Sequence, residues 1–462
     1  MTRPKRPPAI DAVPAVKKYL DRHAEAEAHQ LPDVCGPWEN VVAIPACREG
    51  DTPGDALRSL DLAARRRERR ALIILVVNGR ASAPPETHRS NAETIASVQC
   101  LGTIRQVGAG LSLIENRHSD VLLVDRSSEG RRFPDKQGVG LARKIGCDIG
   151  LALITRGDVS TEWIHTTDAD AIVPATYFDP AIEAGRVAGV SALALPFRHH
   201  FPPHTAFGTA AALYELSLRY FVLGLRHARS PYAFQTIGST MAFGARAYAE
   251  VRGFPRKEAG EDFYLLNKLA KVGRVASAAG APIELKARPS DRVPFGTGVG
   301  VTKIEREGAQ GQGFHLYHPR TFSHLRDLMD TFEGFAESGD VGAARIHLES
   351  TPWGAEGGAI AEALGVWGAL QEAGENTRSP PACLKRIHTA FDAFRTRKMV
   401  HALRDSVLPP MPWREALSSA DFLPGMGQTS NATAEELCGS LASLEEQGAP
   451  GARTAAHLRA MG

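Results

Sequence analysis

Runs of apolar residues alternate with amphipathic segments over roughly the first 300 residues of the chain. Val41–Pro45 and Ala71–Val77 are continuous apolar runs, and between them residues 54–70 carry apolar side chains at helical spacing. Further strands are expected at 121–125, 163–167 and 190–196, and a helix at 138–150. Such alternation is typical of a parallel sheet covered by helices, so this part of the chain is predicted to form one α/β unit.

The alternation stops after Gly313. Residues 322–338, 355–372 and 384–402 have helical patterns, and proline-rich turns at 379–381 and 409–412 separate them. We therefore expect an all-α C-terminal region without a cluster of reactive side chains. The predicted organisation is an N-terminal leader (1–38), an α/β domain (39–315) and a helical C-terminal region (316–462).

One predicted helix, 205–228, is apolar on every side and has Glu215, Arg219 and Arg226 as its only charges. Burial between layers is the commoner reason for such a helix, and contact with a membrane surface is the other. The longest clean apolar stretch, Ala71–Val77, is far shorter than the roughly 20 residues that span a bilayer. We expect no transmembrane segment, while peripheral membrane contact remains possible.

Composition and charge narrow the class of protein. With 43% apolar and 23% charged residues the chain is a folded globular protein. Its 54 Lys and Arg nearly balance 52 Asp and Glu, so nucleic acid is not an expected partner. The six cysteines are too widely spaced for a metal clip, and residues 9–20 contain charges where an export signal needs an apolar core. Reduced thiols and a cytoplasmic location are expected.

Two pairs of acidic residues lie where chemistry is expected. Asp168 and Asp170 follow the predicted strand 163–167, at the carboxyl edge of the sheet, where open α/β sheets bind ligands. Two carboxylates there suit Mg²⁺ or Mn²⁺ shared with phosphate oxygens, although a solvated turn or a helix cap is the simpler interpretation of one such pair. Glu261 and Asp262 begin an amphipathic helix that ends at Gly273, where plain capping is again the simpler interpretation.

The order of these motifs resembles glycosyltransferase family 2, whose members have the GT-A fold. The likeness runs from about Val41 to Gly300: Val41-Val-Ala-Ile-Pro-Ala-Cys-Arg-Glu49, Leu75-Val-Val-Asn-Gly79, Thr167-Asp-Ala-Asp170, and Gly253-Phe-Pro followed by Glu261-Asp262. It implies a Rossmann-like mixed sheet flanked by helices and a hexosyltransferase-like activity. The implied donor is a nucleotide-diphospho-sugar, and the implied acceptor is an unknown hydroxyl compound.

The resemblance also implies roles for individual residues. Asp168 and Asp170 would bind Mg²⁺ or Mn²⁺, and Asp262, with Glu261 beside it, would be the general base of an inverting transfer. The resemblance places Pro45, Ala46, Glu49, Asn78, Gly138 and Arg143 around the donor nucleotide. Arg292 is expected there for another reason: it lies in the arginine-containing loop 286–298, and arginine suits phosphate, with a solvated surface loop as the other interpretation. The family usually has Asp where this chain has Asn78. An amide is not a pure acceptor, so the identity of the nucleobase in the donor stays open.

Two other function classes fit some of the same residues. A GT-A protein without turnover would bind a sugar nucleotide and transfer nothing. Asp168-Ala-Asp-Ala-Ile-Val173 also fits the pattern of haloacid-dehalogenase-type phosphatases, in which the first Asp is a nucleophile. That family carries its motif on the first strand of the domain, whereas at least three predicted strands precede it here.

Overall fold

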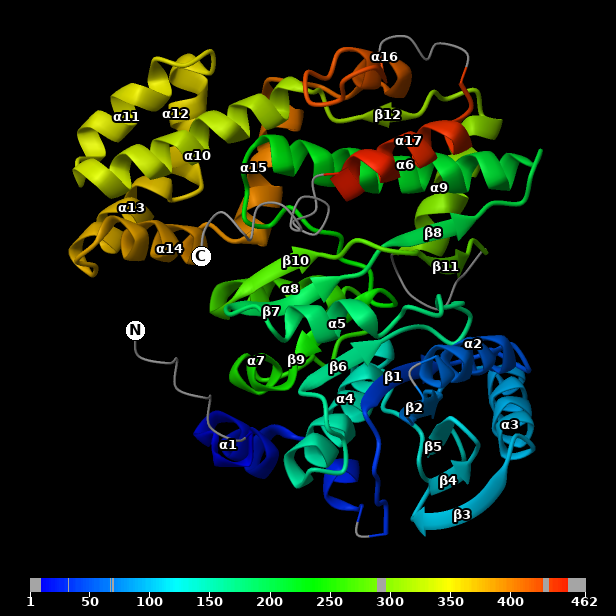
Figure 1. Ribbon diagram of the computed structural model, residues 1–462. Coiled ribbons are helices and arrows are strands. Elements are labelled where there is room, and N and C mark those ends of the chain that lie inside the picture. Colours follow the sequence, from blue (N-terminus) through cyan, green and yellow to red (C-terminus); the bar gives the residue numbers. More distant parts are fainter. Residues whose placement is uncertain are drawn as a thin grey trace. The chain divides into compact units, whose positions relative to one another are not determined.

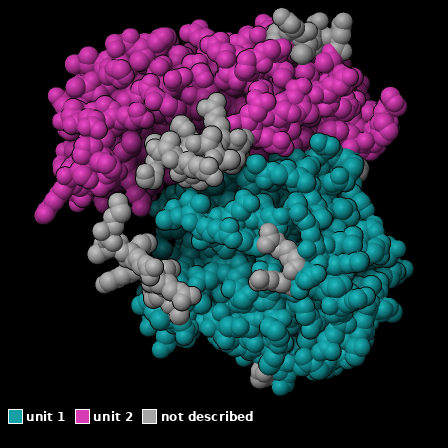
Figure 2. All heavy atoms as spheres, in the orientation of Figure 1, with its two compact units in different colours: residues 1–200, 236–299, 449–462 teal, residues 201–235, 300–448 magenta. Residues whose placement is uncertain are grey.

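The computed structural model describes residues 10–31, 33–66, 68, 70–288, 296–426 and 432–447 (Figure 1). The chain folds into two compact units, shown in different colours in Figure 2. Residues up to 200 and 236–299 belong to the first, and residues 201–235 and 300–447 belong to the second. The sequence predicts domain boundaries after residues 38 and 315. The two compact units divide the chain at other residues, and the predicted domains stay a prediction.

Within the described residues, a nine-stranded mixed sheet forms the centre of the first unit, in the order β10-β7-β9-β6-β1-β2-β5-β4-β3. Neighbours from β6 to β5 are parallel, and β9 is antiparallel to both of its neighbours. The strands are β1 (Asn40–Ala46), β2 (Ala71–Asn78), β3 (Thr103–Gly108), β4 (Leu111–Glu115), β5 (Ser119–Arg126), β6 (Trp163–Thr166), β7 (Val190–Ala194), β9 (Met241–Gly244) and β10 (Arg274–Ser277).

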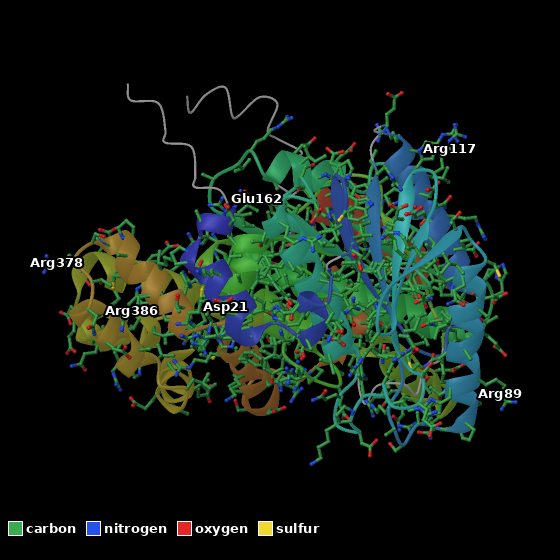
Figure 3. The ribbon with its side chains drawn as sticks, turned by 90° about the horizontal axis from the view of Figure 1, so that it is seen from below. Asp21, Arg89, Arg117, Glu162, Arg378 and Arg386 are labelled. Atoms are coloured by element: carbon green, nitrogen blue, oxygen red, sulfur yellow. The ribbon has the colours of Figure 1, made fainter. Side chains whose placement is uncertain are left out.

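Helices cover both faces of this sheet, which explains why its central strands are apolar throughout. Val42 and Ile44 of β1 share a core cluster with Leu57 and Leu60 of the helix that follows. The helices of the first unit are α1 (Pro14–His23), α2 (Pro53–Arg65), α3 (Pro85–Gln99), α4 (Val139–Arg156), α5 (Asp179–Ala184), α7 (Ala245–Glu250) and α8 (Glu261–Val272). Charged side chains such as Arg89, Arg117 and Glu162 are exposed on the surface of the first unit (Figure 3). The predicted α/β class is confirmed.

Helix α4 lies against the opposite face of β1 and β2 and is almost completely buried. Small residues permit this close packing: a Cβ at Gly146 would lie 2.8 Å from the Cβ of Ala43. The helix nevertheless carries Arg143, Lys144 and Asp148, all buried. Charges inside a protein need partners, so these side chains point to specific contacts.

Lys144 and Asp148 find their partners in each other, in the segment before β1 and in α7. Lys144 Nζ lies 2.6 Å from Asp148 Oδ2, and the Asp148 carboxylate also accepts hydrogen bonds from the Tyr19 hydroxyl at 2.6 Å and the Tyr248 hydroxyl at 2.9 Å. Tyr19 belongs to α1, inside the predicted leader, so this segment is an integral part of the first unit. The cluster holds α4 in place at Asp148 and at Lys144, the residue that follows Arg143.

A two-stranded parallel sheet of β8 (Phe197–His200) and β11 (Ile283–Lys286) also belongs to the first unit. Backbone hydrogen bonds join β11 to the chain just after Asp170: Ile172 N–H donates to the Glu284 carbonyl at 2.9 Å, and Glu284 N–H donates to the Ile172 carbonyl at 2.8 Å. These bonds place the residues that follow β11 beside the Asp168–Asp170 turn.

The second unit is predominantly helical, as predicted. Helix α6 (Ala206–His227) contributes Leu216 and Tyr220 to a buried cluster with Phe322 and Phe332, so the apolar segment 205–228 is buried rather than exposed. Its other elements are α9 (Thr297–Ala309, which begins in the first unit), β12 (His315–Leu316), α10 (Arg320–Ser338), α11 (Val341–Glu349), α12 (Gly354–Ala363), α13 (Val366–Glu375), α14 (Pro380–Ala390), α15 (Ala393–Ser406), β13 (Met411–Pro412), α16 (Trp413–Ser418) and α17 (Ala434–Gln447). None of the helices in the described ranges has the length and apolar character needed to cross a bilayer.

Candidate active site

The carboxyl ends of the parallel strands β6, β1 and β2 meet at one edge of the sheet and bring several predicted site residues together. Asp168 lies two residues beyond the end of β6, and Glu49 lies three residues beyond the end of β1. Asn78 is the last residue of β2. This edge is where open α/β sheets bind ligands.

Arg143 connects the two acidic motifs of the sequence. Its Nη2 donates to Asp168 Oδ1 at 2.6 Å, and its Nε donates to Glu261 Oε1 at 2.9 Å, across 118 residues of chain. The Arg143 side chain is 4% exposed and that of Glu261 is 5%, while that of Asp168 is 39% exposed. Arg143 therefore contacts both acidic motifs, and the nucleotide contact that the resemblance implies for it stays a prediction.

The charges around Arg143 keep the guanidinium protonated. Burial alone would lower the pKa of Arg143, but the negative charges of Asp168, Glu261 and Asp262 raise it above its usual value. The guanidinium thus offsets three carboxylates that would otherwise repel one another. It is the electrostatic centre of the candidate site.

Asp262 differs from the other acidic residues of the site because it keeps its proton up to about neutral pH. Burial raises the pKa of Asp262 to about 7, and the neighbouring charge of Glu261 contributes in the same direction. A hydrogen bond from the Phe263 N–H, 2.7 Å from Asp262 Oδ1, and the charge of Arg143 act in the opposite sense. A carboxylate with a pKa close to the working pH is suited to general base catalysis.

Two glycines allow these contacts to form. A Cβ at Gly140, in the first turn of α4, would lie 2.6 Å from the backbone oxygens of Pro255 and Lys257, so only glycine lets this turn approach that segment. A Cβ at Gly238 would lie 2.6 Å from Arg143 Nη2, and the Thr166 hydroxyl holds the Gly238 carbonyl at 2.6 Å. The sequence alone gave no reason to single out Gly238 or Thr166.

The predicted nucleotide-binding residues lie in different surroundings. Pro45 and Ala46 are buried in the last part of β1, and Asn78 is buried, with its carbonyl accepting a hydrogen bond from the Asn91 side chain at 2.9 Å. Gly138 is the residue before α4. Arg292 lies outside the described residues.

Asn91 is a positioning residue that the sequence did not suggest. Besides its bond to Asn78, its amide donates to Ser127 Oγ at 2.9 Å and its carbonyl oxygen accepts from the Arg48 N–H at 2.8 Å. One buried side chain of α3 thus ties together the end of β2 and the chain segments that follow β1 and β5. No local motif marks this asparagine, since its partners are distant in sequence.

The acidic residues at the edge fit a divalent cation only together with a ligand. Among the described residues, no group of three or more His, Cys, Asp or Glu side chains is placed to hold a metal ion. Asp168 and Asp170 supply two carboxylates, and one or two protein carboxylates with substrate phosphates is the usual arrangement for Mg²⁺. The donor set therefore suits a cation that binds with a diphosphate.

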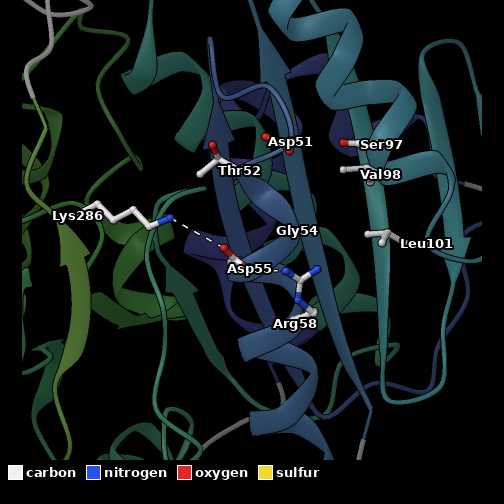
Figure 4. Close-up of a pocket in the computed structure, with 9 residues that line it drawn as sticks. All are labelled: Asp51, Thr52, Gly54, Asp55, Arg58, Ser97, Val98, Leu101 and Lys286. Atoms are coloured by element: carbon white, nitrogen blue, oxygen red, sulfur yellow. Dashed lines mark hydrogen bonds and ion pairs between the residues drawn. The ribbon is translucent and has the colours of Figure 1, made fainter.

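A polar pocket of about 420 Å³ lies near this edge, between the start of α2 and the end of α3 (Figure 4). Lys286 points toward Asp55 across it, with Nζ 4.0 Å from Oδ2, and Arg58 pairs with the same carboxylate. Since these lining charges are paired with one another, we assign no ligand to the pocket.

No protein-family model and no curated protein matches the chain. Solved structures similar to it include mannosyltransferase PcManGT from Pyrobaculum calidifontis in complex with GDP-Man and Mn²⁺, at 15% identity over 84% of this chain and 93% of that one, with a TM-score of 0.34. TarS 1–349 from S. aureus in complex with UDP-GlcNAc is 10% identical over 76% and 90%, also with a TM-score of 0.34. Glucosyl-3-phosphoglycerate synthase from Mycobacterium tuberculosis, in complex with Mn²⁺, UDP and phosphoglyceric acid, is 15% identical over 61% and 84%, with a TM-score of 0.33. TM-scores this low leave the function to be argued from the residues of the chain itself.

Replacing Arg143 by Met should destabilise the protein by about 3–5 kcal/mol, because removing one partner of a buried ion pair leaves uncompensated buried charge. Denaturant titration measures this loss. Arg105→Met is the matched control, since Arg105 and Glu115 form an exposed pair worth about 1 kcal/mol or less. A loss for Arg143→Met no larger than that of the control would contradict the role assigned to Arg143, and adding Glu261→Gln should recover part of the stability.

Proposed function

We propose that the chain is a glycosyltransferase that moves a sugar from a nucleotide-diphospho-sugar to an acceptor hydroxyl, with Mg²⁺ or Mn²⁺. The observation that carries the proposal is the meeting of Asp168 and Glu261 on the buried Arg143, beside Asp262 with its raised pKa. A potential cation ligand and a potential general base thereby share one site. Family 2, with its GT-A fold, is the class whose motifs this arrangement fits.

Asp168 and Asp170 are proposed to hold the cation against the diphosphate of the donor. When bound, such a cation offsets the negative charge that grows on the departing diphosphate. Glu49 and Asn78, at the ends of the neighbouring strands, would lie around the nucleoside, and Arg292 would approach the phosphates. Pro45, Ala46 and Gly138 would shape the same site through the backbone.

Asp262 is proposed to accept the proton of the acceptor hydroxyl while that oxygen attacks the anomeric carbon. A carbon–oxygen bond to the acceptor forms as the bond to the diphosphate breaks, and the nucleoside diphosphate leaves. A single displacement of this kind inverts the anomeric centre. Glu261, held by Arg143, stands beside Asp262 and helps to set its pKa.

A screen of sugar nucleotides by thermal shift tests the proposal, since a ligand that binds only the folded state raises the melting temperature. With Mn²⁺ present, we expect at least one UDP- or GDP-sugar to raise it, and EDTA to abolish the shift. A panel without any effect, in Mn²⁺ or Mg²⁺, would count against the donor class. Binding without turnover would favour the alternative of a sugar-nucleotide-binding protein.

A cytoplasmic location is also part of the proposed function.

A further inference from the structure

Arg288 lies between two carboxylates of the candidate donor site. Its Nη2 is 2.6 Å from Glu49 Oε2 and 2.8 Å from Asp170 Oδ2. The Glu49 side chain is 6% exposed and that of Asp170 is 15%, while that of Arg288 is 32% exposed. One nitrogen of the guanidinium therefore contacts both of these largely buried carboxylates.

The fold itself sets this position of Arg288. The backbone bonds between Ile172 and Glu284 attach β11 to the chain just after Asp170. Arg288 follows the end of β11 by two residues, and Glu49 follows the end of β1 by three. All three charged side chains thus lie within three residues of a paired segment, unlike an ordinary pair of long surface side chains.

A divalent cation and this guanidinium compete for the same carboxylate. Mg²⁺ binds oxygen at roughly 2.0–2.1 Å, closer than Arg288 Nη2 approaches Asp170, so both cannot occupy that side of the carboxylate. Two positive groups at such short range would also repel each other. Cation binding at Oδ2 of Asp170 therefore requires Arg288 to move away.

We propose that Arg288 is a tethered cation that holds Asp170 until metal and donor arrive together. The inference rests on the proposed function. Arg288 lowers the affinity of the site for metal alone, because the metal must displace it. A diphosphate that binds with the metal gives the displaced guanidinium a new anionic partner, since arginine is well suited to phosphate. Metal and nucleotide then bind cooperatively, with Arg288 as the source of the coupling.

Removing the guanidinium should therefore tighten the binding of Mn²⁺ alone. Titration of Mn²⁺, with the free ion measured by its electron paramagnetic resonance signal, compares wild type with Arg288→Met in the absence of nucleotide. We expect about tenfold tighter binding by the variant, within the 5- to 150-fold range usual for coupled ligands. Arg288→Lys keeps the charge, so its affinity for Mn²⁺ should stay near that of wild type. The control variant Arg105→Met should also bind Mn²⁺ as wild type does. If Arg288→Met does not fold, Arg288→Gln replaces it.

The coupling to nucleotide is the second measurement. UDP or GDP should tighten Mn²⁺ binding by wild type more than by Arg288→Met. Two results together would overturn the tethered-cation role and leave the proposed function standing. Arg288→Met would bind Mn²⁺ no more tightly than wild type does, and Asp170→Ala would not bind Mn²⁺ at all. Absence of Mn²⁺ binding by every variant, even with UDP or GDP, would overturn both.

Discussion

Replacing Asp262 by Asn should lower kcat by roughly 10²- to 10⁴-fold, the usual contribution of a general base, and leave donor affinity nearly unchanged. Asn keeps the size of the side chain and an oxygen that accepts from the Phe263 N–H, but it cannot take a proton. Because the lost interaction exists only in the transition state, kcat and kcat/KM should fall together. Steady-state kinetics on the purified variant measure both.

A helix cap offers the matched control for Asp262. Asp340 precedes α11 and accepts from the Ala343 N–H, so Asp340→Asn makes the same chemical change at the start of another helix. It should leave kcat unaltered. If Asp262→Asn likewise kept near-normal kcat and only lowered the melting temperature, Asp262 would be a capping residue and Glu261 would be the next candidate base.

The raised pKa of Asp262 also predicts two effects of pH. Turnover of the wild type should rise with pH up to about 7, as the carboxyl group loses its proton, and this limb should be missing from Asp262→Asn. The folded pKa lies above the usual value of 3.8, so the stability contributed by this group is present at low pH and is lost as pH rises toward 7. The melting temperature of Asp262→Asn relative to wild type should therefore increase between pH 5 and pH 8, and a relative decrease would contradict the assigned pKa.

Replacing Asp170 by Ala should weaken Mn²⁺-dependent binding of UDP or GDP by more than about 100-fold, because loss of a partner outside the first coordination shell already costs 10- to 100-fold. Calorimetric titration with the nucleoside diphosphate, in Mn²⁺ and in EDTA, measures the change. The fold should survive, since Arg288 keeps its pair with Glu49 in the variant.

Asp179→Ala is the control for Asp170→Ala, because Asp179 pairs with Arg66 on the surface of the same unit. It should bind nucleotide as the wild type does. Unchanged nucleotide affinity in Asp170→Ala, or in wild type with EDTA, would remove the cation from the proposal.

The centre of the sheet was predictable because burial on both faces leaves a clear pattern. β1, β2 and β5 contain continuous apolar runs, and the predicted helix 138–150 corresponds to α4, which extends to Arg156. The hairpin of β3 and β4 was missed, since most of β3 is exposed. Helix breaks were missed too: the predicted helix 355–372 is two helices, because Gly365 adopts a left-handed conformation with φ of +67°.

The site was predictable as a set of motifs and unpredictable as a set of contacts. The sequence indicated Asp168, Asp170, Glu261 and Asp262, but the ion pair between Arg143 and Glu261 spans 118 residues and leaves no local pattern. Gly238 and Asn91 act through such distant contacts as well. Only the topology of the sheet, which brings the ends of separate strands to one edge, shows which of these side chains meet.

Phosphorus NMR of a sugar nucleotide mixed with the wild-type protein and Mg²⁺ tests the central claim most directly. For a donor that binds, we predict that its diphosphate signals give way to those of the free nucleoside diphosphate, with water as a slow acceptor, and that Asp262→Asn slows the change by about 10²-fold or more. A donor that stays intact at high protein concentration, or that yields a nucleoside monophosphate and a sugar phosphate, would contradict a glycosyltransferase.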